Sequence, residues 1–213
     1  MRAFDLIIFD CDGVVVDSEP ISNRVFRELL SELGLDLSEQ EVYARFLGRS
    51  MADSLASIEA MTGRPVAPSV LARYKANRDR VLREEVTAVD GVTALIRALD
   101  VPYCIASSGD HDKMRATLGA TGLLSLFEGR VFSATEVARA KPAPDVFLYA
   151  AAQMAVDPAR ALVIEDTING VKAANAAGMT VYGFAGLTPA AQLSAAGAHR
   201  TFTHMRDLEP LLL

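Results

Sequence analysis

The sequence predicts an α/β protein in which a Rossmann-like parallel sheet carries an inserted, all-helical cap subdomain. Three observations lead to this prediction. An apolar run at 6–9 ends in Asp10 and Asp12, four helical segments then follow one another, and from Gly91 apolar strands alternate with helices. Such alternation is typical of a parallel sheet covered by helices on both faces. A crossover between parallel strands needs only one helix, so four in succession indicate an insertion.

The first expected strand, residues 6–9, is an unbroken apolar run and should be buried on both faces. An ionised carboxylate is not left unpaired in a core, so the strand must end at Asp10 and present it at the sheet's C-terminal edge. Gly13 permits a sharp turn just past Asp12. Two acids this close can share a cation, or act as a nucleophile and a proton-transfer group. The alternative is a strand end capped by solvated acids.

The insertion is expected to span 17–85, which leaves 1–16 and 86–213 for the α/β core. Apolar residues recur at helical spacing, and Ser38 with Glu41 has the form of a capping box. Glycines at 34 and 48 interrupt the pattern. The four expected helices are residues 19–33, a second that begins at Ser38 and is broken by Gly48, 51–61, and the region after Pro65 up to about Glu85.

From Gly91 the expected core elements alternate. The helices are 92–99, 113–118, 146–154 and 170–177. The strands are 102–106, 130–132, 161–164 and 180–184, with a last short strand at 198–202. Ligands bind outside the carboxyl ends of the strands in such sheets, so the residues after each strand are the candidates for a site.

Polar residues follow two of these strands, and a lysine stands in a loop between them. Ser107, Ser108 and Gly109 follow the second strand, and their hydroxyls and amides can face an anion. Glu165 and Asp166 follow the strand at 161–164, and Lys141 stands in a loop stiffened by prolines. Taken singly, each has an ordinary explanation as a helix cap or a solvated side chain. Together, four acids and a lysine at one edge suit Mg²⁺ and a phosphoryl group.

Composition excludes several other classes. Apolar residues make up 51% of the 213 residues, and the net charge is −6 without a long basic run. We therefore expect a folded protein that binds neither nucleic acid nor a membrane surface. We also expect it to be a monomer. The N-terminus lacks the pattern of a signal peptide, and the uncharged stretch 173–198 is interrupted by glycines and Pro189. Cys11 and Cys104 lie in apolar runs, as free thiols of a cytoplasmic protein would.

The sequence resembles the haloacid dehalogenase superfamily, in the branch with a helical cap inserted after the first strand. The likeness covers essentially the whole chain and all four motifs, in order: Asp10-Cys11-Asp12-Gly13, Ser107, Lys141 in Lys-Pro-Ala-Pro-Asp, and Glu165-Asp166. Within the superfamily it is similar to sugar-phosphate phosphatases and β-phosphoglucomutase-like enzymes, with phosphogluconate phosphatases as the nearest likeness. The resemblance implies a Mg²⁺-dependent phosphatase that acts on a small sugar or sugar-acid phosphate.

The resemblance also implies roles for the motif residues. Asp10 would be the nucleophile, and Asp12 would protonate the leaving oxygen, later activate water, and ligate Mg²⁺ through its backbone carbonyl. Asp10 and Asp166 would supply carboxylate ligands to Mg²⁺. Glu165 would either bind the ion directly or contact its ligands. Lys141 and Ser107 would bind phosphoryl oxygens, with Ser108 and Gly109 beside them. In the cap, Gly48 and Arg49 lie in the loop where this branch contacts the leaving group; a solvated arginine beside a helix-breaking glycine is the alternative.

Two departures bear on the choice between functions. Ser22 stands where the mutases carry a histidine, and Met51 where they carry an arginine for a distal phosphate. Both weaken the alternative of a phosphomutase. A second alternative, a non-catalytic metabolite-binding protein of the same fold, predicts a damaged motif, and none is damaged. Cys11 could be imagined as a thiolate nucleophile, but acidic neighbours raise the pKa of a thiol.

Overall fold

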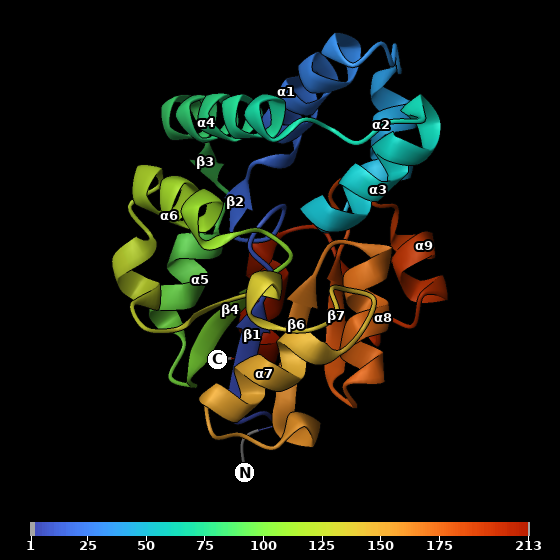
Figure 1. Cartoon of the computed structure of the whole chain (residues 1–213). Coiled ribbons are helices and arrows are strands. Elements are labelled where there is room, and N and C mark those ends of the chain that lie inside the picture. Colours follow the sequence, from blue (N-terminus) through green and yellow to red (C-terminus); the bar gives the residue numbers. More distant parts are fainter. Residues whose placement is uncertain (1–2, 213) are drawn as a thin grey trace.

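The structure is a computed structural model that describes residues 3–212 (Figure 1). Within that range six strands form one sheet in the order β5-β4-β1-β6-β7-β8, with all neighbours parallel. The central strand β1, Leu6–Phe9, pairs with β4 on one side and β6 on the other. The remaining strands are β4 (Tyr103–Ser107), β5 (Val131–Ser133), β6 (Ala161–Glu165), β7 (Thr180–Phe184) and β8 (Arg200–Phe202). The predicted α/β fold class is confirmed.

Helices cover both faces of the sheet, as the alternation of side chains on β1 requires. Ile7 and Phe9 pack in a core with α5 (Val92–Ala98), α6 (His111–Ala120) and the C-terminal elements η4 (Met205–Leu208) and α10 (Glu209–Leu212). Leu6 and Ile8 pack in a second core on the opposite face. That core includes side chains of α7 (Asp145–Gln153), α8 (Ile168–Ala176) and α9 (Ala190–Ala195).

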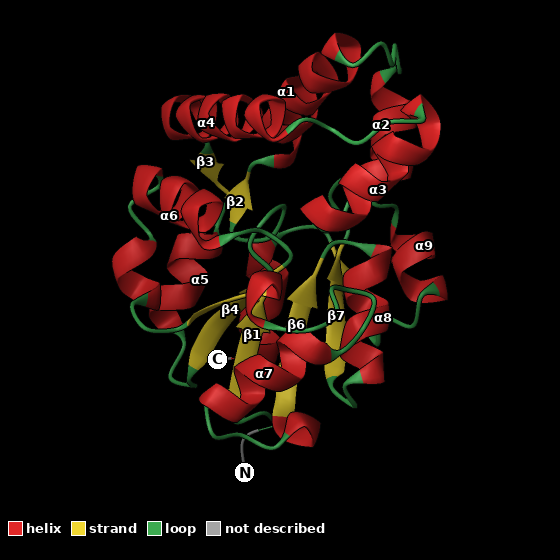
Figure 2. Ribbon diagram, in the orientation of Figure 1, coloured by secondary structure: helices red, strands yellow, loops and turns green. Residues whose placement is uncertain are grey.

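Four helices precede the alternating part and lie beyond the carboxyl ends of the strands (Figure 2). They are α1 (Glu19–Glu32), α2 (Glu39–Phe46), α3 (Met51–Thr62) and α4 (Pro68–Glu85). The expected capping box is present at the start of α2, where Ser38 and Glu41 bond reciprocally. This helical region has an apolar cluster of its own, in which Phe26 contacts the rings of Phe46 and Tyr74 edge-on.

The chain leaves and re-enters the core through a short antiparallel pair that was not predicted. β2, Val16–Asp17, pairs with β3, Thr87–Ala88. Segments of two residues carry no periodicity, so the sequence gives no signal for them. The pair places both crossings between the helical region and the core next to each other.

Two strands end one residue later than expected, which moves two site residues into the sheet. Ser107 is the last residue of β4 and pairs with Ser133, and Glu165 is the last residue of β6 and pairs with Gly183. The neighbouring strands reach far enough to pair with both, so the ladder continues despite their polar side chains. Among the described residues, no helix is long and apolar enough to cross a membrane.

Candidate active site

The ends of β1, β4 and β6 bring the predicted residues to one edge of the sheet. Asp10 follows β1 directly, and its backbone N–H donates to the carbonyl of Ile164 on β6 at 2.9 Å. Gly13 closes the turn after Asp12 with φ +76°, and any Cβ there would overlap the carboxylate of Asp166. The turn therefore requires glycine on two grounds, conformation and close approach.

Lys141 lies at the centre of the acidic groups. Its Nζ is 2.6 Å from Oδ1 of Asp10 and 2.8 Å from Oε1 of Glu165, and it also donates to the carbonyl of Ala106 at 3.1 Å. Burial alone would lower the pKa of this lysine, but Asp10 and Glu165 outweigh it and hold the pKa above its ordinary value. Lys141 is therefore a permanent cation, although only 3% of the surface of this residue is exposed.

Three carboxylates form a group that could hold a metal ion. Asp10, Glu165 and Asp166 each offer one oxygen, and these oxygens lie within 4.8 Å of one another. Burial raises the pKa of Asp10 to about 8, against the opposing charge of Lys141. Burial, followed by the charges of Glu165 and Asp10, also raises the pKa of Asp166 well above its ordinary value.

Asp166 supplies the clearest sign that the group fits a cation. Its Oδ1 is buried and has no hydrogen-bond partner among the described residues. Glu165 differs, because its Oε2 accepts from the backbone N–H and hydroxyl of Thr167 at 2.7 and 2.9 Å while its Oε1 contacts Lys141. A hard divalent cation would give Asp166 a partner and offset the crowded charge, and carboxylate oxygens are the ligands that such cations prefer.

Asp12 has a separate environment. Its Oδ1 lies 2.8 Å from Nζ of Lys113, on the first turn of α6, and accepts a hydrogen bond from Ser18. Burial would raise the pKa of Asp12, but Lys113 and the Ser18 hydroxyl together lower it. The pKa of Asp12 is thus lowered, whereas the pKa values of Asp10 and Asp166 are raised, and Asp12 is a carboxylate in the free protein.

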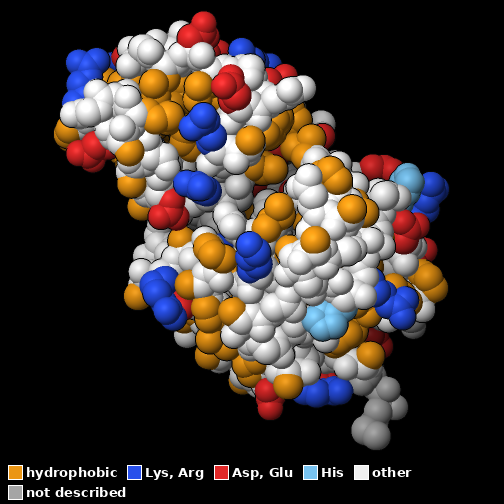
Figure 3. All heavy atoms as spheres, turned by 90° about the vertical axis from the view of Figure 1, so that its right-hand side faces the viewer, with side chains coloured by type: hydrophobic (Ala, Val, Ile, Leu, Met, Phe, Trp, Pro, Cys, Tyr) orange, Lys and Arg blue, Asp and Glu red, His pale blue; other side chains and the backbone are white. Residues whose placement is uncertain are grey.

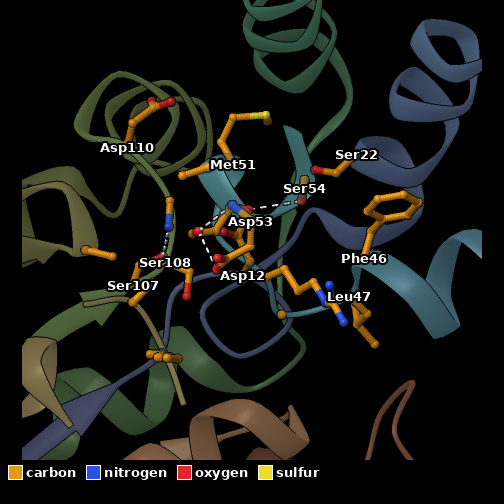
Figure 4. A pocket seen from close by; sticks show the side chains of 18 of the residues that line it. Asp12, Ser22, Phe46, Leu47, Met51, Asp53, Ser54, Ser107, Ser108 and Asp110 are labelled. Carbon is orange, nitrogen blue, oxygen red and sulfur yellow. Dashed lines mark hydrogen bonds between the residues drawn. The ribbon is translucent and has the colours of Figure 1, made fainter. Parts of the chain in front are cut away.

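The loop after β4, which the sequence suggested could face an anion, is arranged around Ser107. The hydroxyl oxygen of Ser107 accepts from the backbone N–H of Gly109 at 3.0 Å, which leaves the hydroxyl proton available to a ligand. Figure 4 shows Ser107 and Ser108 on one side of Asp12, with Ser22 and Phe46 of the helical region on the other. The loop therefore faces the same space as Asp12.

That space is a cavity of about 700 Å³ between the sheet edge and the helical region. It is lined by every predicted site residue except Asp166, which lies behind Gly13. Figure 3 shows the two parts of the molecule meeting at a narrow waist on one face. A volume of this order suits a small ligand rather than a macromolecule.

The loop between α2 and α3 touches the core directly. Gly48 has φ +69°, and a Cβ there would lie 2.9 Å from Cβ of Thr167, the residue that follows Asp166. Arg49 is exposed, lines the cavity and donates to the hydroxyl of Ser57 at 3.2 Å. The loop thus closes the cavity on the side of the acidic group.

Several cavity residues were not predicted as site residues. The polar ones include Glu19, Asn23, Arg78 and Lys113. Asn23 is 6% exposed and makes no side-chain hydrogen bond within residues 3–212, and the buried hydroxyl of Ser22 has none either. The only signal for Lys113 in the sequence is its place in the first turn of the helix after Ser107, Ser108 and Gly109, which is too general to identify a function.

The two cysteines do not contribute nucleophiles. Cys11 and Cys104 are both free and buried. Burial, with added effect from Asp12 and Asp10, raises the pKa of the Cys11 thiol well above its ordinary value, and burial raises that of Cys104 to about 12. Neither forms a thiolate at neutral pH.

Comparison with known proteins identifies the family of the chain. The sequence model of the haloacid dehalogenase-like hydrolases matches residues 4–178. The 6-phosphogluconate phosphatase of Escherichia coli K12 is 30% identical over 212 residues, 99% of this chain and 96% of that protein. The fructose-1-phosphate phosphatase YqaB of the same organism is 33% identical over 177 residues, 81% of this chain and 92% of its own. A crystal structure of a haloacid dehalogenase-like protein from Agrobacterium tumefaciens C58 superposes with a TM-score of 0.81 at 38% identity, covering 98% and 97% of the two chains.

Proposed function

Because the chain belongs to the haloacid dehalogenase-like hydrolases and is a phosphatase of that family, we propose that it hydrolyses a small sugar or sugar-acid phosphate with Mg²⁺. The 6-phosphogluconate phosphatase relative makes phosphogluconate the first candidate, and the fructose-1-phosphate phosphatase makes ketose phosphates the second. The observation that carries the proposal is the contact of Lys141 with Asp10 and Glu165 next to the unpartnered oxygen of Asp166.

Asp10 is the proposed nucleophile. Lys141 contacts its Oδ1, and no described residue donates a hydrogen bond to its other oxygen, which can attack phosphorus and form an aspartyl phosphate. Lys141 and Ser107 bind phosphoryl oxygens, and Ser108 and Gly109 complete that loop. Mg²⁺ held by Asp10, Asp166 and the backbone carbonyl of Asp12 would offset the charge that collects when a phosphate dianion enters.

Asp12 is the proposed acid and base. It gives a proton to the leaving sugar oxygen in the first half-reaction and takes one from water in the second. In the free protein its lowered pKa favours the carboxylate, which is the form needed for the second half. The protein must therefore acquire a proton at Asp12 before an alkoxide can leave.

The helical region is the proposed cap, with 17–85 as its extent and 1–16 and 86–213 as the core. Gly48 and Arg49 would contact the leaving group, since their loop closes the cavity over Thr167. Ser22 and Asn23 line the same cavity, and neither side chain has a hydrogen-bond partner within residues 3–212. Buried polar groups without partners are costly, and sugar hydroxyls would satisfy them.

The test is release of inorganic phosphate from a panel of phosphorylated metabolites, with and without Mg²⁺. The panel includes 6-phosphogluconate, fructose 1-phosphate, hexitol phosphates and a hexose 1-phosphate assayed for isomerisation. We expect Mg²⁺-dependent release from one sugar class. An isomerised product without net release would indicate the phosphomutase, which Ser22 and Met51 disfavour. No turnover of any member would indicate a metabolite-binding protein.

A further inference from the structure

Asp12 is held through only one of its two carboxylate oxygens. Nζ of Lys113 lies 2.8 Å from Oδ1, and the hydroxyl of Ser18 donates to the same atom. No described residue donates a hydrogen bond to Oδ2. The two oxygens of this carboxylate therefore have different surroundings.

Oδ2 faces the loop proposed to hold the phosphoryl group. A Cβ built on Gly109 would lie 3.5 Å from Oδ2 of Asp12 and 3.3 Å from Oγ of Ser107, so these two atoms approach the same point of the loop. Figure 4 shows Asp12 directed into the space between Ser107 and the helical region. The free oxygen is the one on the side of the reacting group.

Lys113 is itself held in place. Its backbone N–H donates to Oδ1 of Asp110, the N-cap of α6, at 2.8 Å. Arg78 of α4 approaches the same Asp110 carboxylate at 3.3 Å, so the helical region supports the start of α6. The Lys113 side chain is 13% exposed, unlike the solvated lysines of a protein surface.

We propose that Lys113 is a positioning residue that, with Ser18, fixes Asp12 through Oδ1 and so makes Oδ2 the oxygen that exchanges the proton. The inference rests on the proposed acid–base role of Asp12. As Asp10 bonds to phosphorus, the bond from phosphorus to the sugar oxygen breaks, its electron pair stays on that oxygen, and the proton of Oδ2 moves to it. When water attacks phosphorus, a proton of that water moves to Oδ2. The bond between phosphorus and Asp10 breaks, and its electron pair stays on the Asp10 oxygen.

This role differs from substrate binding by Lys113 in a measurable way. A sugar alkoxide leaves only with a proton, whereas a nitrophenolate leaves readily without one. Loss of the anchor therefore slows phosphorylation by a sugar phosphate and leaves phosphorylation by nitrophenyl phosphate nearly intact. Loss of a binding lysine slows both, because both substrates carry the same phosphoryl group.

The experiment measures phosphorylation of the protein by rapid mixing, with the preferred sugar phosphate and with nitrophenyl phosphate. The variants are Lys113→Met, Lys113→Arg and Ser18→Ala, with Lys172→Met on the exposed face of α8 as the control. Lys113→Met should slow the sugar phosphate by about 10- to 10²-fold and the aryl ester by less than about threefold. Lys113→Arg should keep most of the rate of phosphorylation by the sugar phosphate. Ser18→Ala should also slow the sugar phosphate more than the aryl ester, but by a smaller factor than Lys113→Met.

Equal slowing of both substrates by Lys113→Met, or no slowing of either, overturns the inference. If Lys113→Met does not fold, as judged by its thermal melt, Ser18→Ala decides: loss of rate without leaving-group selectivity overturns the inference as well. Asp12→Asn is measured in parallel. If Asp12→Asn itself shows no selectivity, the acid–base assignment has failed, which is a separate result from a failure of Lys113 alone.

Discussion

Nζ of Lys141 lies 2.6 Å from Oδ1 of Asp10, a contact between residues 131 positions apart in the sequence. The same Nζ lies 2.8 Å from Glu165, and all three side chains are buried. Lys141 is the cation that Asp10 and Glu165 share, so its removal would leave buried carboxyl groups without a counter-charge. Asp10, the proposed nucleophile, and Lys141, the proposed phosphate-binding cation, therefore form one ionic unit with Glu165.

Lys141→Met tests that unit. The change leaves Asp10 and Glu165 facing each other without a cation, so turnover of every phosphate ester should be lost. The free energy of unfolding should fall by about 3–5 kcal/mol, the usual cost of breaking a buried ion pair from one side. Urea denaturation and phosphate release give the two readings, with Lys172→Met as the control. Near-normal turnover in Lys141→Met would mean that the lysine only balances charge.

Much of the site could be predicted because parallel strands share one edge. Asp10, Ser107 and Glu165 stand at or next to strand ends, and strand ends can be located from apolar runs alone. The pairing of Lys113 with Asp12 could not be predicted, because it depends on the rotation of α6 about its axis. The contact of Gly48 with Thr167 depends on how the helical region sits on the core, which no local pattern encodes.

Removal of the metal should abolish activity, and addition of Mg²⁺ should restore it, because Asp10 and Asp166 would otherwise repel the substrate phosphate. Mg²⁺ should also raise the melting temperature of the wild-type protein. At 100 times its Kd a ligand adds about 2.7 kcal/mol, which is roughly 5–10 °C for a chain of this size. Asp166→Asn should lose most of this shift, whereas Asp36→Asn, at an exposed acid of the helical region, should keep it. Full turnover in excess chelator would refute the assignment of Mg²⁺.

Gly48→Ala should interfere with closure of the cavity. A methyl group there meets Thr167 at 2.9 Å and also disfavours φ +69°. We expect kcat/KM for the sugar phosphate to fall by about 10²-fold, since small displacements of a bound group are costly. Gly63→Ala is the matched control, because Gly63 has φ +72° but nothing within 4 Å of its would-be Cβ. Equal effects of the two changes would attribute the loss to backbone strain rather than to the contact with Thr167.

Glu19 should make substrate binding depend on pH. Burial raises its pKa to about 7, so the carboxyl is neutral below that pH and negatively charged above it. A new negative charge in the cavity repels a phosphate ester, so KM should rise as the pH passes through about 7. An interaction of roughly 1 kcal/mol corresponds to about a fivefold change in KM. Glu19→Gln should remove this rise, and the ratio of the two KM profiles cancels the ionisation of the substrate itself. Parallel profiles for the two proteins would show that Glu19 does not face the substrate.

We propose that Asp10 becomes phosphorylated while Asp12 moves protons, and a rapid-mixing experiment on Asp12→Asn tests this most directly. Asp12→Asn is mixed rapidly with nitrophenyl phosphate, the release of nitrophenol is followed, and the quenched protein is examined by mass spectrometry of its peptides. A burst of about one nitrophenol per protein is expected, because this leaving group needs no proton, followed by slow turnover because water lacks its base. The phosphate should be found on Asp10, and Asp10→Asn should give neither burst nor adduct. A burst-free time course in Asp12→Asn, with no phosphate on Asp10, would contradict the account.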